Sequence, residues 1–87
     1  MINIDFTTKP KTKEIAPEYE VRFGAKYTND EIGRLHSYND EPAIIILGSG
    51  EQHWYKHGER HRDNGKPAII WSGGKKQYWV NNERIYK

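Results

Sequence analysis

The chain has 87 residues, of which 34% are hydrophobic, 30% charged and 13% aromatic, with a net charge of +2 and no cysteine. This length accommodates one domain around one small core, and the lack of cysteine excludes disulfides and thiolate metal sites. The sequence contains neither a run of about 20 apolar residues, as a membrane helix requires, nor a signal-peptide pattern at residues 1–13. We therefore expect a cytoplasmic protein without a membrane partner.

Charge is distributed unevenly along the chain. Residues 1–50 carry six Lys and Arg against eight Asp and Glu, whereas residues 51–87 carry eight against four and hold all three tryptophans. Such asymmetry allows an acidic partner, protein or nucleic acid, on the C-terminal side. A solvated sheet face with Lys and Arg on the outside explains the same pattern equally well.

Two segments near the N-terminus alternate between apolar and polar residues. INIDF (2–6) and YEVRF (19–23) each follow this pattern, which is typical of half-buried antiparallel strands. The segment between them is polar and contains prolines, so we expect a loop there. The sequence thus predicts an N-terminal pair of strands within residues 1–26.

Residues 28–38 allow two interpretations. Thr28 and Glu31 form a capping-box pattern that favours a short helix. Gly33 favours a turn instead.

A repeat follows, since GRLHSYNDEPAIIILGSGEQHWY (33–55) aligns with GERHRDNGKPAIIWSGGKKQYWV (58–80). A constant period of this size is typical of repeated supersecondary units. A further copy begins at NNERIYK (81–87). The identical pairs are Gly33/Gly58, His36/His61, Pro42/Pro67, Ala43/Ala68, Ile44/Ile69, Ile45/Ile70, Gly48/Gly73, Gln52/Gln77 and Trp54/Trp79.

Each copy is expected to form a β-hairpin, in which glycines make the turn between a β-branched strand and a second strand that contains Trp. The fold class is therefore predicted as all-β, a small antiparallel meander of about six strands. The first strand, AIIIL (43–47), is apolar on both faces, so it is either central and covered or part of an interface such as a homodimer. Trp54 and Trp79 share a repeat position, and we expect them to lie one above the other in the core.

The spacing Gly-x-x-His, then Pro-Ala and two aliphatic residues, then Gly and Trp resembles MORN-like repeats, especially those of phages and large viruses. The resemblance covers residues 27–87, with repeat one at 27–57 and repeat two plus a truncated third copy at 58–87. The first copy departs from the pattern, with Ser37 in place of Arg and Asp40 in place of Gly. The resemblance implies a β-hairpin binding surface without catalytic activity, and a small phage accessory protein located in the cytoplasm of the host cell.

The histidines do not predict a catalytic or metal site. His53, His57 and His61 follow one another at every fourth position, but strand and turn residues lie between them, so their side chains should not converge as zinc ligands must. His36 and His61 share a repeat position, which suggests a structural hydrogen bond that bridges successive turns. HRDNG (61–65) lacks the converging partners that acid–base catalysis needs. We expect no enzyme activity, no cofactor and no metal.

The aromatic and basic residues indicate a binding role. Trp71 has no aromatic counterpart in the first copy, and Trp and Arg are enriched at binding hot spots. We expect a protein-binding module that inhibits or redirects a host protein, such as a component of a defence system. Binding of single-stranded or non-specific nucleic acid through the same residues and a homodimeric structural role are the alternatives. The candidate contact residues are Trp71, Lys75, Lys76, Tyr78, Arg60 and Arg62.

Overall fold

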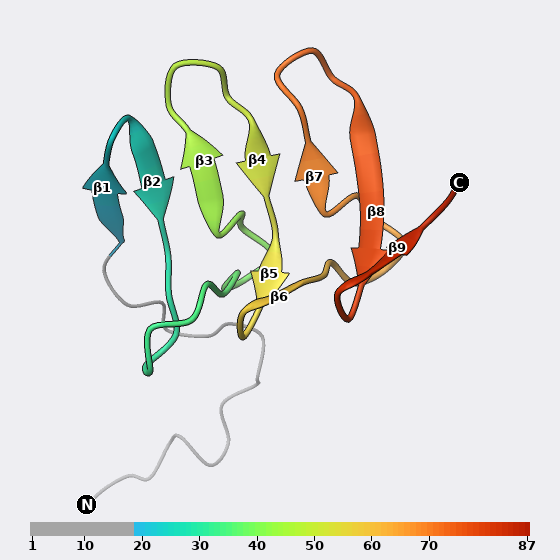
Figure 1. Cartoon of the computed structure of the whole chain (residues 1–87), viewed down its shortest axis with the longest axis horizontal. Helices are drawn as coiled ribbons and strands as arrows, with labels where there is room; N and C mark the ends of the chain where they lie inside the picture. The colour runs from blue at the N-terminus through green and yellow to red at the C-terminus, as the bar shows by residue number, and fades with distance from the viewer. Residues whose placement is uncertain (1–18) are drawn as a thin grey trace, which may run out of the picture.

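The computed structural model describes residues 19–87, which form one antiparallel sheet and a small second pair of strands (Figure 1). The seven-stranded sheet has the order β1-β2-β3-β4-β7-β8-β9, and β5 pairs with β6. The described residues contain no helix, and hence none long and apolar enough to cross a membrane. The predicted all-β antiparallel meander is confirmed. Its strands are β1 (Glu20–Arg22), β2 (Ala25–Tyr27), β3 (Ile44–Ile46), β4 (Gln52–His53), β5 (Tyr55–Lys56), β6 (Glu59–Arg60), β7 (Ile69–Ile70), β8 (Lys76–Val80) and β9 (Glu83–Ile85).

The predicted strand at 19–23 corresponds to β1, while the predicted strand at 2–6 lies outside the described residues. β1 pairs with β2 across the turn Phe23-Gly24, where both residues have positive φ, 50° and 75°. Such a turn matches the right-handed twist of the strands it joins.

Residues 28–38 form a turn rather than a helix. It is closed by an isolated bridge between Asn29 and Leu35, and Gly33 within it has a φ of 91°.

The repeat is visible in the backbone hydrogen bonds, but its period is not constant within a unit. Ala43 N donates to His53 O and Ala68 N to Gln77 O, each at 2.8 Å. The offset from His53 to Gln77 is therefore one position shorter than the offset from Ala43 to Ala68. The cause is the hairpin loop, which spans 47–50 in the first unit but only 72–74 in the second, as the closing bonds from Ile46 N to Glu51 O and from Trp71 N to Lys75 O show.

This shift changes which aromatic residues are equivalent. Trp54 occupies the structural position of Tyr78, and Trp79 that of Tyr55. Because successive strand residues point to opposite faces, Trp54 and Trp79 lie on opposite faces of the sheet. The expectation that they stack in one core is wrong, since a constant period takes no account of the shorter second loop.

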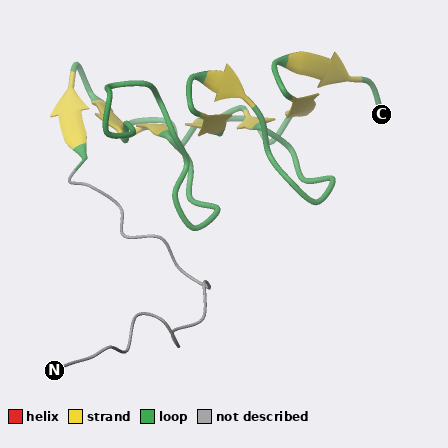
Figure 2. Ribbon diagram, turned by 90° about the horizontal axis from the view of Figure 1, so that it is seen from below, coloured by secondary structure: helices red, strands yellow, loops and turns green. Residues whose placement is uncertain are grey.

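The core is thin. Its buried hydrophobic residues are three alanines, Ile69 and Trp54, and no large side chain is fully buried among the described residues. Two long connections, 36–43 and 61–68, project from the same side of the sheet (Figure 2). β3 is an interior strand, between β2 and β4, but its three isoleucines are only partly buried. No second layer covers the opposite face within residues 19–87.

Candidate functional site

The two connections, 36–43 and 61–68, share one backbone shape. Asn39 and Asp40 have φ values of 56° and 62°, and the equivalent Asn64 and Gly65 have 66° and 69°. Between the connections lies a groove of about 540 Å³, whose floor includes Trp54.

Asp40 joins the first connection to the second. Its carboxylate accepts two hydrogen bonds from Arg62, from Nε at 3.0 Å and from Nη2 at 3.2 Å, and one from Lys66 Nζ at 2.9 Å. The guanidinium of Arg62 lies 3.7 Å from the centre of the Trp54 ring, and Trp54 Nε1 donates to the carbonyl of Asp40 at 2.9 Å. The hydrogen bonds from Arg62, together with Lys66, lower the pKa of Asp40 despite partial burial. We call Asp40, Arg62, Lys66 and Trp54 the Asp40 clamp.

A weaker version of this arrangement follows one repeat later. Lys87 Nζ lies 4.7 Å from the centre of the Tyr78 ring and 3.4 Å from the carbonyl oxygen of Gly65. Gly65 has no side chain to accept the cation, so the second clamp, made of Gly65, Tyr78 and Lys87, lacks the carboxylate of the first.

His36 and His61 play the same structural role, as their shared repeat position predicts. Nδ1 of His36 accepts the backbone N–H of His57, and Nδ1 of His61 accepts that of Asn81, each at 3.0 Å. Nε2 of His61 lies 2.6 Å from a carboxylate oxygen of Asp63, which suits a neutral ring that donates from Nε2. The predicted hydrogen bond that bridges successive turns is therefore confirmed.

Asp30 organises the turn that precedes the first connection. Its side chain is buried, with Oδ1 accepting from the N–H groups of Ile32 and Arg34 and Oδ2 lying 2.9 Å from Arg34 Nε and 2.8 Å from His57 Nδ1. Burial opposes ionisation, but the hydrogen bonds from His57, Arg34 and the backbone outweigh it and lower the pKa of Asp30 far below its ordinary value. Asp30 thus ties the turn at 28–38 to the β5–β6 hairpin.

These contacts satisfy the polar groups of the groove largely within the chain. The two nitrogens of His61 and all three nitrogens of the Arg62 guanidinium have partners in the protein. Within residues 19–87, no three His, Asp or Glu side chains come together as metal ligands. The groove is therefore a joint between the two repeats.

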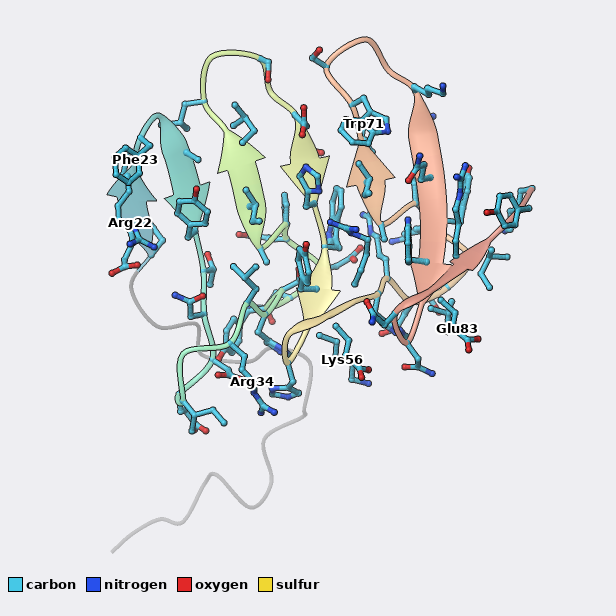
Figure 3. All side chains as sticks on the ribbon, in the orientation of Figure 1. Arg22, Phe23, Arg34, Lys56, Trp71 and Glu83 are labelled. Carbon is cyan, nitrogen blue, oxygen red and sulfur yellow. The ribbon has the colours of Figure 1, made fainter. Side chains whose placement is uncertain are left out.

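The six predicted contact residues lie on both faces of the sheet. Register and alternation place Trp71 on the same face as Gln77 and Trp79, and Lys76 and Tyr78 on the other. Trp71 stands at the end of β7, beside the hairpin turn (Figure 3). Arg60 lies over Trp79 on the face of Trp71, Arg62 is held in the Asp40 clamp on the side of Tyr78, and Lys75 lies exposed just after the hairpin loop.

The face that carries Trp71 also carries a group of aromatic side chains around the guanidinium of Arg60. The Arg60 guanidinium lies 5.1 Å from the ring centres of both Tyr55 and Trp79 and donates to the Tyr55 hydroxyl at 2.6 Å. Trp71 contacts His53 edge-on, with ring centres 5.7 Å apart. We call Tyr55, Arg60, Trp71 and Trp79 the aromatic face; all four are only partly buried.

The sequence alone does not reveal Tyr55, Trp79, Asp30 and Asp40 as site residues. A constant repeat period places Trp79 in the core, because it hides the shorter second loop. Asp40 stands out as a departure from the repeat, and that departure is the available signal. Asp30 has no signal of its own, since an acidic residue in a polar turn is ordinary.

Comparison with known proteins finds no match among family models, curated proteins or solved structures. The resemblance of residues 27–87 to MORN-like repeats therefore stays a prediction from their motif.

Proposed function

We propose that the protein is a non-catalytic protein-binding module and that it binds its partner through the aromatic face. The observation that carries this proposal is that Arg60 packs against Tyr55 and Trp79 on the same sheet face as Trp71, with all four side chains partly exposed and no second layer over that face within residues 19–87. Trp, Tyr and Arg are the residues that most often dominate binding energy. The exposed Lys75, directly opposite Trp71 across the hairpin, suits a partner surface with an apolar centre and a carboxylate at its rim.

The engagement of the arginines favours protein over nucleic acid as the partner. Arg62 is bound to Asp40, and Arg60 packs between two rings and donates to Tyr55. A surface for single-stranded nucleic acid needs cations free to contact phosphates as well as rings on which bases stack. On the aromatic face the rings are present, but Arg60 is already committed to Tyr55 and Trp79.

The finer form of the proposal is an accessory protein that inhibits or redirects a host protein, such as a defence component. It is supported by the resemblance to phage-type MORN-like repeats and by the polar groups of the groove, which form hydrogen bonds within the chain. This form predicts a specific protein partner rather than a substrate.

The test begins with capture of partners by the tagged chain from a bacterial lysate, with and without nuclease. A captured protein is then titrated against Trp71→Ala and, as a matched control on the opposite face, Tyr78→Ala. We expect Trp71→Ala to weaken binding by about 2 kcal/mol or more, as hot-spot residues do, and Tyr78→Ala to leave affinity within about threefold, on the same scale. Circular dichroism verifies that both variants are folded.

Nucleic acid as the partner would give a different result. Binding would disappear after nuclease treatment, and its affinity would fall steeply with salt because phosphate contacts release counterions. Equal loss of protein binding in the two variants would also contradict the assignment of the aromatic face.

A further inference from the structure

β1 forms one end of the sheet, and among the described residues it pairs only with β2. An edge strand with free backbone groups is a ready template for another strand. Three of the most exposed large apolar residues lie along this edge: Tyr19 is 57% exposed, Val21 55% and Phe23 98%. Figure 3 shows Arg22 and Phe23 at the outer limit of the sheet.

The backbone of Val21 points away from the sheet. The two-residue turn closes at the pair Arg22 and Ala25, which is followed by the pair Val21 and Lys26. Hydrogen-bonded and non-hydrogen-bonded pairs alternate in an antiparallel ladder. Since the closing pair is hydrogen-bonded, the N–H and C=O of Val21 face outward, where a second strand would bond to them.

We propose that the β1 edge is a dimerisation site that binds β1 of a second copy of this chain, antiparallel and centred on Val21. In that register Val21 lies opposite Val21 of the second copy, and the two exchange both backbone hydrogen bonds. Glu20 lies opposite Arg22 of the second copy, and Tyr19 opposite its Phe23. The short sequence YEVRF is thus complementary to itself in charge and in apolar character.

The other end of the sheet lacks this property. Antiparallel pairing of β9, Glu83–Ile85, about its centre would place Arg84 opposite Arg84 of the second copy, and like charges directly opposite are destabilising. Pairing at β1 alone is isologous and therefore closed, so it produces a dimer with a continuous sheet rather than a filament. This inference does not depend on the aromatic face or its partner.

The experiment compares the mass of the full chain with that of charge variants by sedimentation equilibrium. We expect the wild type to dimerise reversibly. Glu20→Lys places two cations opposite each other, and Arg22→Glu places two carboxylates, so each single variant should raise the dimer dissociation constant about tenfold or more. The double variant Glu20→Lys/Arg22→Glu exchanges the charges and should restore the dimer.

Mixing the two single variants gives the sharpest result. The Glu20→Lys chain presents two cations and the Arg22→Glu chain two carboxylates, so the mixture should form heterodimers more tightly than either variant forms homodimers. Glu83→Lys, at the other edge, is the matched control and should dimerise like the wild type.

Two results would overturn the proposal. One is a wild-type chain that stays monomeric at every protein concentration, as it would if residues 2–6 of the same chain occupied this edge. The other is dimerisation that neither single variant weakens and that mixing does not enhance, which would place the interface elsewhere. Circular dichroism of each variant separates loss of the dimer from loss of the fold.

Discussion

The two clamps, one at each long connection, show how one backbone shape is held with different strength. In the Asp40 clamp, the backbone of Asp40 adopts the left-handed conformation and its carboxylate binds Arg62 and Lys66. The Arg62 guanidinium lies 3.7 Å from the centre of the Trp54 ring. In the second clamp, Gly65 takes the same conformation without strain, and Lys87 stands 4.7 Å from Tyr78.

This difference shows that a residue that departs from the repeat motif can add an interaction to the fold. Glycine is the easy residue at a positive φ, and aspartate is one of the few others that tolerates it. At position 40 an aspartate takes the positive φ, and its carboxylate forms ion pairs with Arg62 and Lys66 of the second repeat.

The largest expected effect is the difference in stability lost when the aromatic residue of each clamp, Trp54 or Tyr78, is replaced by alanine. Trp54 is only 4% exposed and Tyr78 is partly exposed, so Trp54→Ala should cost about 3–5 kcal/mol of unfolding free energy and Tyr78→Ala about 1–2 kcal/mol. Urea denaturation measures both. Equal losses would mean that the two clamps are equivalent, contrary to the comparison.

Removal of the Asp40 carboxylate should leave the first clamp without its ion pairs, as the second clamp is. Asp40→Ala is expected to cost about 1–2 kcal/mol, because alanine is strained in the left-handed region and the ion pairs are lost. Asp40→Gly loses the ion pairs but not the conformation, so its cost should stay below about 1 kcal/mol, as exposed pairs predict. A larger loss for glycine than for alanine, measured by urea denaturation, would refute this division.

The opposite substitution, Gly65→Asp, adds the missing carboxylate to the second clamp. A Cβ at Gly65 would lie 3.5 Å from Lys87 Nζ, so an aspartate there would have a cation beside it. We expect Gly65→Asp to be more stable than Gly65→Asn, which tolerates the positive φ about as well, by about 0.5–1 kcal/mol, the range of an exposed ion pair. Urea denaturation measures the difference, which should vanish at about 1 M NaCl, where the screening length is only about 3 Å, and in a Lys87→Ala background.

The smallest effect concerns pH. Since the pKa of Asp40 is lowered in the folded protein, its ionised form contributes stability that is fully present above the ordinary carboxyl pKa, about 3.9, and is lost as pH falls through the lower folded value. The difference in melting temperature between wild type and Asp40→Asn should therefore be constant from about pH 7 to about 5 and shrink below about 4. A difference that grows on acidification would reverse the sign of the linkage.

Much of the fold could be predicted from the sequence because its signals are local. Two aligned copies, glycines at the hairpin turns and β-branched runs after proline define the strands β3, β4, β7 and β8, and alternation at 19–23 defines β1. The shorter offset between the return strands could not be predicted, since the sequence does not show that the loop at 72–74 closes one position earlier.

The candidate site was less predictable because its residues meet only after folding. Trp71 and Arg60 share a face through strand register, and register depends on a loop length that the aligned copies do not reveal. In the Asp40 clamp, Asp40 binds Arg62 and Lys66, which follow it by 22 and 26 positions in the sequence. Nothing in the sequence around Asp40 indicates these partners.

The thin, single-layer sheet also determines how the protein should open. Main-sheet strands contact chiefly their immediate neighbours in the sheet order, so stability is close to a sum of nearest-neighbour terms along one dimension. Amide hydrogen exchange should therefore be slowest in the middle, at β3 and β4, and become faster toward β9, with fraying as the main route. Another copy of the repeat unit inserted between the two existing ones should lengthen the sheet and leave the existing hairpins intact.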